Sequence, residues 1–214
     1  MGIIGVGNMG SALVRGIIDR GIINKKSIII CDIDNNKVDI LCKELGVIDG
    51  GEAENVTNLS DLIILASKPQ NITSLLKQIS NEVNASKTVM SIAAGVTTSS
   101  IEEFLPKIPI IRVMPNLPAL IGEGMSIFCR GAYVSEIDVN RVITVLDAIG
   151  ICSEYSEELM DSVTALSGTG PGSFNVGLGT NSLCTNRFGS CNTAVGQFSL
   201  DKLRSIVAGV SDRN

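Results

Sequence analysis

A glycine-rich segment near the start of the chain has the spacing that phosphate binding requires. Residues 5–10 read Gly-Val-Gly-Asn-Met-Gly, the pattern G-x-G-x-x-G. Gly5 permits a tight turn out of a strand, Gly7 lets a pyrophosphate approach the backbone, and Gly10 lets the following helix pack on the strand. The first amides of that helix then face the phosphates. We predict a dinucleotide site here; the alternative is an ordinary strand-to-helix turn.

A carboxylate follows this turn at a distance that suits ribose binding. Asp32 ends the next apolar run, 22 positions after Gly10. A carboxylate there commonly accepts hydrogen bonds from the ribose 2′-hydroxyl of NAD and repels the 2′-phosphate of NADP. The equal alternative is that Asp32 or Asp34 only caps the next helix. The nearest cation that follows is Lys37, so the pattern leans towards NAD without excluding NADP.

Three later runs also end in residues that suit a ligand site. Ligands in open α/β sheets bind outside the carboxyl ends of the strands. Lys68, just after one run, could reach a phosphate or a carboxylate, and a solvated lysine is the equal alternative. Ala93 and Ala94 would let a flat ring approach, or they serve helix–sheet packing. Asn116 could orient a carboxamide, or it is a turn residue.

Other kinds of catalytic site are excluded or not favoured. The chain has no His, which removes Ser-His-Asp and Cys-His catalysis and His-ligated metals, and its six Cys form no C-x-x-C pair. Glu157, Glu158 and Asp161 cluster together, and we interpret them as a helix N-terminus favoured by its dipole rather than as a catalytic pair. We therefore predict no metal site, and any chemistry must use a cofactor, carboxylates, Lys, hydroxyls or the backbone.

The elements that must position these residues alternate along the chain. Strands alternating with helices at this spacing predict βαβ units and a parallel sheet, hence a Rossmann-like α/β fold. We expect a dinucleotide-binding domain over residues 1–155 and the start of a second, helical domain over 156–214. The predicted strands cover 1–4, 27–33, 61–67, 88–93, 108–113 and 124–129, and the predicted helices cover 11–20, 35–45, 70–79, 99–105 and 135–149.

The composition changes after Pro171. Residues 172–198 contain 15 Gly, Ser, Asn or Thr among 27 and a single charge, Arg187. No period of 2 or 3.6 survives, and such a composition usually buries too little apolar surface to offset the entropy of ordering. We expect an atypical and disordered segment here, followed by a short helix over 200–210.

Charge and hydropathy exclude several kinds of partner. The net charge is −5 and no block of five like charges occurs, so we expect no nucleic-acid surface. No apolar run reaches the roughly 18 residues of a membrane span, so we expect no membrane partner. Free thiols without a signal peptide favour the reducing cytoplasm.

Five segments together resemble one enzyme family, pyrroline-5-carboxylate reductase. They are IIGVGNMGSAL, DLIILASKPQ, SIAAGVTTSSIE, IIRVMPNLPALIGEGM and MDSVTALSGTGP, and they fall within residues 1 to about 171. The resemblance implies reduction of the C=N bond of 1-pyrroline-5-carboxylate to L-proline with NADPH or NADH, as the last step of proline biosynthesis. It also implies a homo-oligomer, in which a helical second domain pairs the subunits and completes the substrate pocket.

The resemblance also implies which residues touch the cofactor. The glycine turn would hold the pyrophosphate and the neighbouring ribose, and the ends of the later strands would flank the nicotinamide. In this chain the residues so implied are Ile4, Gly5, Val6, Gly7, Asn8 and Met9, then Ala66, Ser67, Lys68 and Pro69, then Ile92, Ala93, Ala94 and Asn116. We add Gly10 and Asp32 to the predicted cofactor-binding residues because they belong to the glycine motif and the acid that follows it.

The chain departs from the family after residue 171. The segment V-T-S-P-G-G-T-T, which grips the substrate carboxylate in the family, has no counterpart here, nor do the long helices of the interface. A change of reading frame shortly after Pro171 would produce such a tail. The alternative function is therefore an NAD(P)-binding domain that is catalytically inactive.

Overall fold

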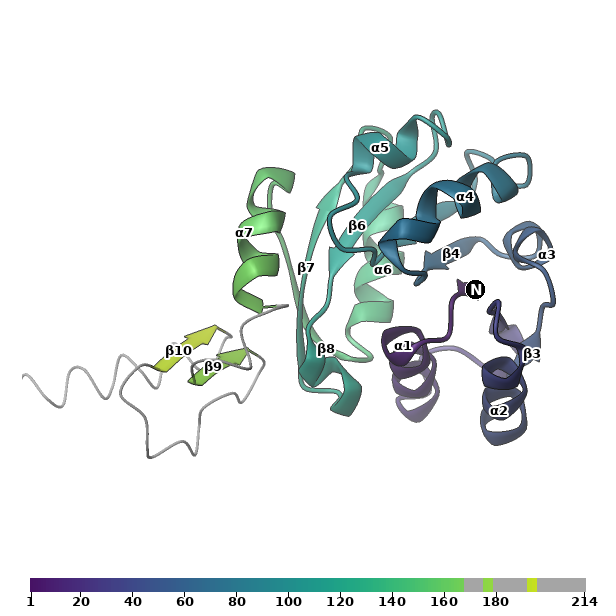
Figure 1. Cartoon of the computed structure of the whole chain (residues 1–214), viewed down its shortest axis with the longest axis horizontal. Helices are drawn as coiled ribbons and strands as arrows, with labels where there is room; N and C mark the ends of the chain where they lie inside the picture. The colour runs from purple at the N-terminus through teal and green to yellow at the C-terminus, as the bar shows by residue number, and fades with distance from the viewer. Residues whose placement is uncertain (168–174, 179–191, 196–214) are drawn as a thin grey trace, which may run out of the picture.

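An eight-stranded sheet forms the centre of the molecule. The structure is a computed structural model that describes residues 1–167, 175–178 and 192–195. The strand order is β3-β2-β1-β4-β5-β6-β7-β8, and every neighbouring pair is parallel except β6 and β7 (Figure 1). The strands are β1 (Gly2–Ile4), β2 (Ile29–Cys31), β3 (Ile48–Asp49), β4 (Leu62–Leu65), β5 (Thr88–Ser91), β6 (Ile110–Met114), β7 (Gly124–Arg130) and β8 (Gly150–Glu154). The predicted Rossmann-like α/β fold is confirmed.

The central strands are buried on both faces, which explains their continuous apolar runs. All four residues of β4 are buried, and so are all four of β5. Successive side chains point to opposite faces, so Ile64 packs in one apolar cluster while Ile63 and Leu65 pack in the other.

Helices cover both faces of the sheet and make it the middle of three layers. One face packs against α1 (Asn8–Asp19), α2 (Asn35–Leu45) and α6 (Glu136–Leu146). The other packs against α3 (Ala53–Asn58), α4 (Pro69–Ile79) and α5 (Thr98–Glu102). Two 3-10 turns, η1 (Lys25–Ser27) and η2 (Leu117–Ile121), join elements. None of the helices in the described ranges combines the length and hydropathy that crossing a membrane needs.

The helix α7 (Glu157–Ser167) lies beside β7, on the same face as α5 (Figure 1). Its Met160 is fully buried against Ile127 and Cys129 of β7. The first turns of α7 are thus packed against the central sheet.

Several predicted boundaries hold and others are wrong. The helix predicted over 35–45 has those bounds, and Gly46 ends it in the left-handed conformation with φ 72°. The helix predicted over 135–149 ends at Leu146, and Gly150 begins β8 instead of ending a helix. The reason is close backbone pairing: Gly150 has φ 147°, and a Cβ there would lie 2.5 Å from the Gly124 nitrogen. The short elements β3 and α3 were not predicted.

After Pro171, the structure describes two short strands. A two-stranded parallel sheet joins β9 (Asn175–Leu178) to β10 (Asn192–Val195). Ladder hydrogen bonds use backbone groups that every residue but proline carries in full, so strands can form without an apolar period. The helix predicted over 200–210 lies outside the described residues.

Candidate cofactor-binding site

Two of the three glycines in the turn have no room for a side chain, and the third faces open space. Gly5 has φ 100°, and a Cβ there would lie 2.7 Å from the carbonyl oxygen of Ala66. A Cβ on Gly10 would collide with the carbonyl oxygen of Gly5. A Cβ on Gly7 would meet nothing within 4 Å. Gly5 and Gly10 are therefore needed for packing, whereas Gly7 leaves space that a ligand can occupy.

The first turn of α1 faces this open side without a side-chain cap. Gly7 is the N-cap residue, and no side chain accepts a hydrogen bond from the first turn. The hydroxyl of Ser11 donates back to the Gly7 carbonyl at 2.6 Å. The free amides and the positive end of the helix dipole favour an anion here. This geometry fits the phosphates of a dinucleotide.

A cavity of about 930 Å³ adjoins the turn. This volume lies within the range of about 300–1,000 Å³ that small-molecule sites occupy. It brings together seven of the predicted residues, namely Ile4, Gly5, Gly7, Asp32, Ala66, Ser67 and Lys68. The other nine predicted residues, Val6, Asn8, Met9, Gly10, Pro69, Ile92, Ala93, Ala94 and Asn116, are not part of its wall.

The carboxylates of Asp32 and Asp34 form different hydrogen bonds. The carboxylate of Asp34 accepts a hydrogen bond from the Asn36 amide at 3.2 Å and caps α2. The carboxylate of Asp32 accepts from the Val6 amide at 2.7 Å and from the Asp34 amide at 2.9 Å. Asp32 therefore does more than cap a helix: it ties the end of β2 to the glycine turn, and it lines the cavity.

Ser67 offers a polar group that the fold leaves without a partner. Its hydroxyl oxygen is buried, and within the described part of the chain it has no hydrogen-bond partner. A buried hydroxyl without a partner is costly, so such a group needs an explanation. Because Ser67 lines the cavity next to Lys68, which is exposed, a ligand hydroxyl or phosphate would supply the missing bond.

One wall of the cavity was not predicted from the sequence. It consists of the segment after β2, the segment before α3, and one face of α4. Ile33 is 96% exposed at this wall, an unusual place for a large apolar side chain. Four of the lining α4 residues follow helical spacing, i, i+3, i+4 and i+7, and Gln70 precedes them in the first turn. That spacing in a polar stripe was the available signal. These residues are Ile33, Asn35, Gly51, Glu52 and Ala53, and Asn71, Ser74, Leu75 and Gln78 of α4.

The predicted nicotinamide-end residues lie at the ends of β5 and β6. The Ala93 amide donates to the Ser91 hydroxyl at 3.4 Å, and Ala94 is exposed. Asn116 is 2% exposed, and its side-chain oxygen accepts from the Met125 amide at 3.0 Å. Asn116 thus connects the end of β6 to the start of β7, in addition to any contact with a ligand.

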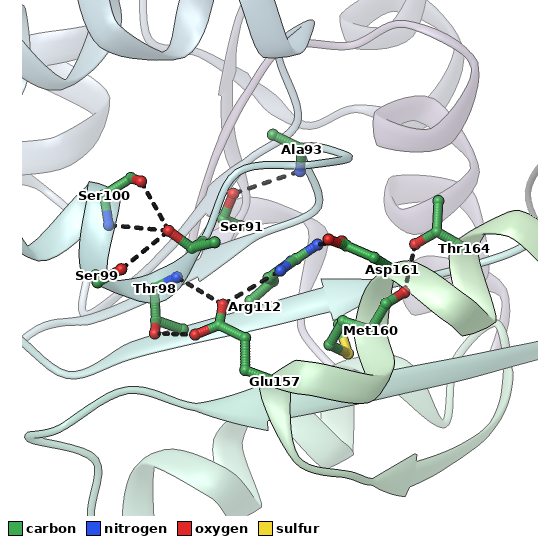
Figure 2. A network of polar contacts seen from close by, with 11 residues as sticks. Ser91, Ala93, Thr98, Ser99, Ser100, Arg112, Glu157, Met160, Asp161 and Thr164 are labelled. Atoms are coloured by element: carbon green, nitrogen blue, oxygen red, sulfur yellow. Dashed lines mark hydrogen bonds and ion pairs between the residues drawn. The ribbon is translucent and has the colours of Figure 1, made fainter.

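A polar network joins α7 to the segment that follows β5 (Figure 2). Glu157 accepts from the Thr98 amide at 2.8 Å through one carboxylate oxygen and from the Thr98 hydroxyl at 2.7 Å through the other. Arg112, which is 3% exposed, donates to Glu157 at 3.3 Å and to Asp161 at 2.8 Å. Glu157 and Asp161 therefore do more than favour a helix dipole, because they neutralise a buried guanidinium.

Burial disfavours the thiolate form of three cysteines in the described part of the chain. Burial, reinforced by the Asp32 carboxylate, raises the pKa of the Cys31 thiol to about 12. Burial also raises the pKa of Cys129 and of Cys152 to about 11. The thiolate is the reactive form. These thiols are protonated at neutral pH, so thiolate catalysis finds no support among them.

The comparisons with known proteins show which proteins this chain is similar to. Residues 1–95 match the family model described as NADP oxidoreductase coenzyme F420-dependent. The chain is similar to the pyrroline-5-carboxylate reductase of Methanosarcina acetivorans, with 37% identity over 172 residues, which cover 80% of this chain and 64% of the relative. Over residues 1 to about 171, the chain is similar to pyrroline-5-carboxylate reductases.

Solved structures of the family share this architecture. The chain is similar to the structure of a pyrroline-5-carboxylate reductase from Coxiella burnetii, with a TM-score of 0.76 and 28% identity over 79% of this chain and 64% of that one. It is also similar to Plasmodium falciparum pyrroline carboxylate reductase with NADP bound, with a TM-score of 0.70 and 33% identity over 79% and 62%. The chain thus spans less than two thirds of the length of these family members.

Proposed function

We propose that this chain binds a reduced nicotinamide dinucleotide and reduces 1-pyrroline-5-carboxylate to L-proline. The observation that carries the proposal is the uncapped glycine turn beside a cavity of about 930 Å³, in a chain that is 37% identical to a pyrroline-5-carboxylate reductase over 172 residues. As the last step of proline biosynthesis, the reaction needs a hydride donor, and NADPH or NADH supplies the hydride when bound.

The residues divide into three groups along the proposed cofactor. The turn residues Ile4, Gly5, Val6, Gly7, Asn8, Met9 and Gly10 would hold the pyrophosphate and the neighbouring ribose. Ala66, Ser67, Lys68 and Pro69 follow β4, and the hydroxyl of Ser67 is available for a bond. Ile92, Ala93, Ala94 and Asn116 would flank the nicotinamide end. Asp32 lines the cavity at the end of β2, where it would accept from the hydroxyls of the adenosine ribose.

The proposed reaction asks little of side-chain acids or bases. A protonated imine is already a good hydride acceptor, so the main contribution of the protein is to hold two reactants in a close and fixed orientation. We therefore propose no catalytic side chain in this part of the chain. The absence of His from the sequence is compatible with this chemistry.

A second candidate function is cofactor binding without turnover. It is favoured by the extent of the match, which covers 64% of the Methanosarcina acetivorans relative. In this case residues 1–155 would act as a cofactor-binding domain, and residues 156–214 would not complete the substrate pocket or the homo-oligomer interface. For either function we propose a cytoplasmic location, which the free thiols of Cys31, Cys42, Cys129 and Cys152 support.

Two assays on one sample separate the candidates. NADH or NADPH is titrated into the full chain by fluorescence, and proline formation from 1-pyrroline-5-carboxylate is followed with the same sample. Binding with turnover supports the reductase. Binding without turnover supports the second candidate. A folded chain that binds neither dinucleotide contradicts both.

A further inference from the structure

The end of the cavity next to β2 carries more negative than positive charge. Asp32, Asp34 and Glu52 line it there, and Lys37 is the cation beside them. The ammonium of Lys37 lies 3.4 Å from a carboxylate oxygen of Asp34, so its charge is already countered. Lys68, the other cation of the wall, stands apart at the N-cap of α4. An additional anionic group at the β2 end would meet unbalanced carboxylates.

Asp32 is held in a fixed orientation at this end. Each of its carboxylate oxygens accepts one backbone amide, from Val6 at 2.7 Å and from Asp34 at 2.9 Å. A carboxylate oxygen has a second lone pair, so both oxygens can accept a further hydrogen bond. The carboxylate is thereby preorganised to receive two neighbouring hydroxyl donors.

The position of Asp32 relative to the turn decides which part of the ligand it meets. A pyrophosphate on the turn would place the adjoining ribose against the end of β2, because the Val6 amide bonded to Asp32 belongs to the turn itself. The cavity continues from there to Ile33, Gly51 and Ala53, which leaves room for a base beyond the ribose. In such a complex, Asp32 would face the 2′ and 3′ positions of the adenosine ribose.

We infer that Asp32 makes this site select NADH over NADPH. The inference rests on the proposed function, since it assumes that a dinucleotide occupies the cavity. A free 2′-hydroxyl donates to the fixed carboxylate, whereas a 2′-phosphate carries a charge of about −1.5 to −2 and is repelled by it. In this respect the chain differs from the Plasmodium falciparum relative, whose structure contains NADP.

The experiment compares the affinities of the full-length chain for NADH and NADPH by fluorescence titration and calorimetry. The wild-type chain is expected to bind NADH at least about tenfold more tightly, in line with hydrogen bonds to a charged acceptor. Raising the salt from about 0.05 M to about 0.5 M should narrow the difference, since screening weakens the repulsion of the 2′-phosphate.

Two variants locate the effect. Asp32→Asn removes the charge at nearly constant shape and should lower the NADH-to-NADPH affinity ratio by at least about tenfold. Asp39→Asn removes one charge from an exposed position of α2 that does not line the cavity, and it should leave the ratio unchanged. Circular dichroism confirms that each variant is folded. The salt series on the wild-type chain does not depend on any variant.

The outcomes separate the inference from the proposed function. Equal or tighter binding of NADPH by the wild-type chain overturns the inference and leaves the proposed function intact. A preference for NADH that Asp32→Asn does not change overturns the role of Asp32. No binding of either dinucleotide by a folded chain overturns the proposed function itself.

Discussion

Two regions of the sheet differ in whether their polar groups have hydrogen-bond partners within the described residues. Around the glycine turn, the first amides of α1 have no side-chain cap and the buried hydroxyl of Ser67 has no partner within the described residues. Between β6 and α7, the buried guanidinium of Arg112 is bonded to two carboxylates, and Glu157 uses both oxygens. The first region leaves polar groups available to a ligand, and the second fixes one element against another. The contrast separates residues that bind from residues that position.

The largest expected effect concerns the closed side of the glycine turn. Gly10→Ala forces a Cβ against the carbonyl oxygen of Gly5, so α1 must move away from β1. Overpacking of this kind costs about 1–3 kcal/mol of unfolding free energy, and backbone contact places this site near the upper value. Urea denaturation measures the loss.

Gly7→Ala is the matched control for that change. Its Cβ enters open space, and its φ of −66° suits any residue. We expect a change within about 0.5 kcal/mol in unfolding free energy, with weakened dinucleotide binding. Equal destabilisation by Gly7→Ala and Gly10→Ala would show that Gly7 has no open space beside it.

The second effect concerns the contacts that fix α7. Glu157→Gln leaves the buried Arg112 with Asp161 as its remaining acidic partner, and Asp161 is 78% exposed. Removing one partner of a fully buried pair costs about 3–5 kcal/mol, and the partial exposure of Glu157 reduces this to about 1–2 kcal/mol. Thermal unfolding measures the loss. Glu158→Gln, on the exposed neighbour, should be close to neutral; a comparable loss there would contradict the assigned role of Glu157.

A third substitution tests the cavity beside the glycine turn. Ser67→Ala removes a hydroxyl that lacks a partner, so the unfolding free energy should stay constant or rise slightly. Dinucleotide affinity should fall about three- to tenfold if the ligand supplies the missing hydrogen bond. A fall in stability with unchanged affinity would mean that the hydroxyl serves the fold.

The smallest effect is a dependence of stability on alkaline pH. Burial raises the pKa of the Cys31 thiol to about 12, well above its ordinary value, so the unfolded chain loses this proton first. Stability then decreases as the pH rises above about 9, by up to about 1.4 kcal/mol per pH unit for one thiol. Cys31→Ala should make the decline of the urea midpoint between about pH 9 and 11 shallower. An unchanged slope would show that Cys31 ionises freely.

The same contrast explains how far the sequence predicted the molecule. The turn at residues 5–10 and the bounds of α2 follow from local chemistry, since Asp34 and Gly46 mark the two ends of that helix. Local patterns could not predict the pairing of Arg112 with Glu157, because 45 positions separate them and the fold alone brings them together. For a similar reason, the α4 wall of the cavity was missed, since its polar stripe resembles any solvated helix face.

Calorimetric titration of a reduced nicotinamide dinucleotide into the folded full-length chain tests the central claim most directly. We predict saturable binding of one dinucleotide per chain, which Gly7→Ala weakens at unchanged stability. Absence of any heat of binding with both NADH and NADPH, in a sample that unfolds cooperatively, would contradict the account.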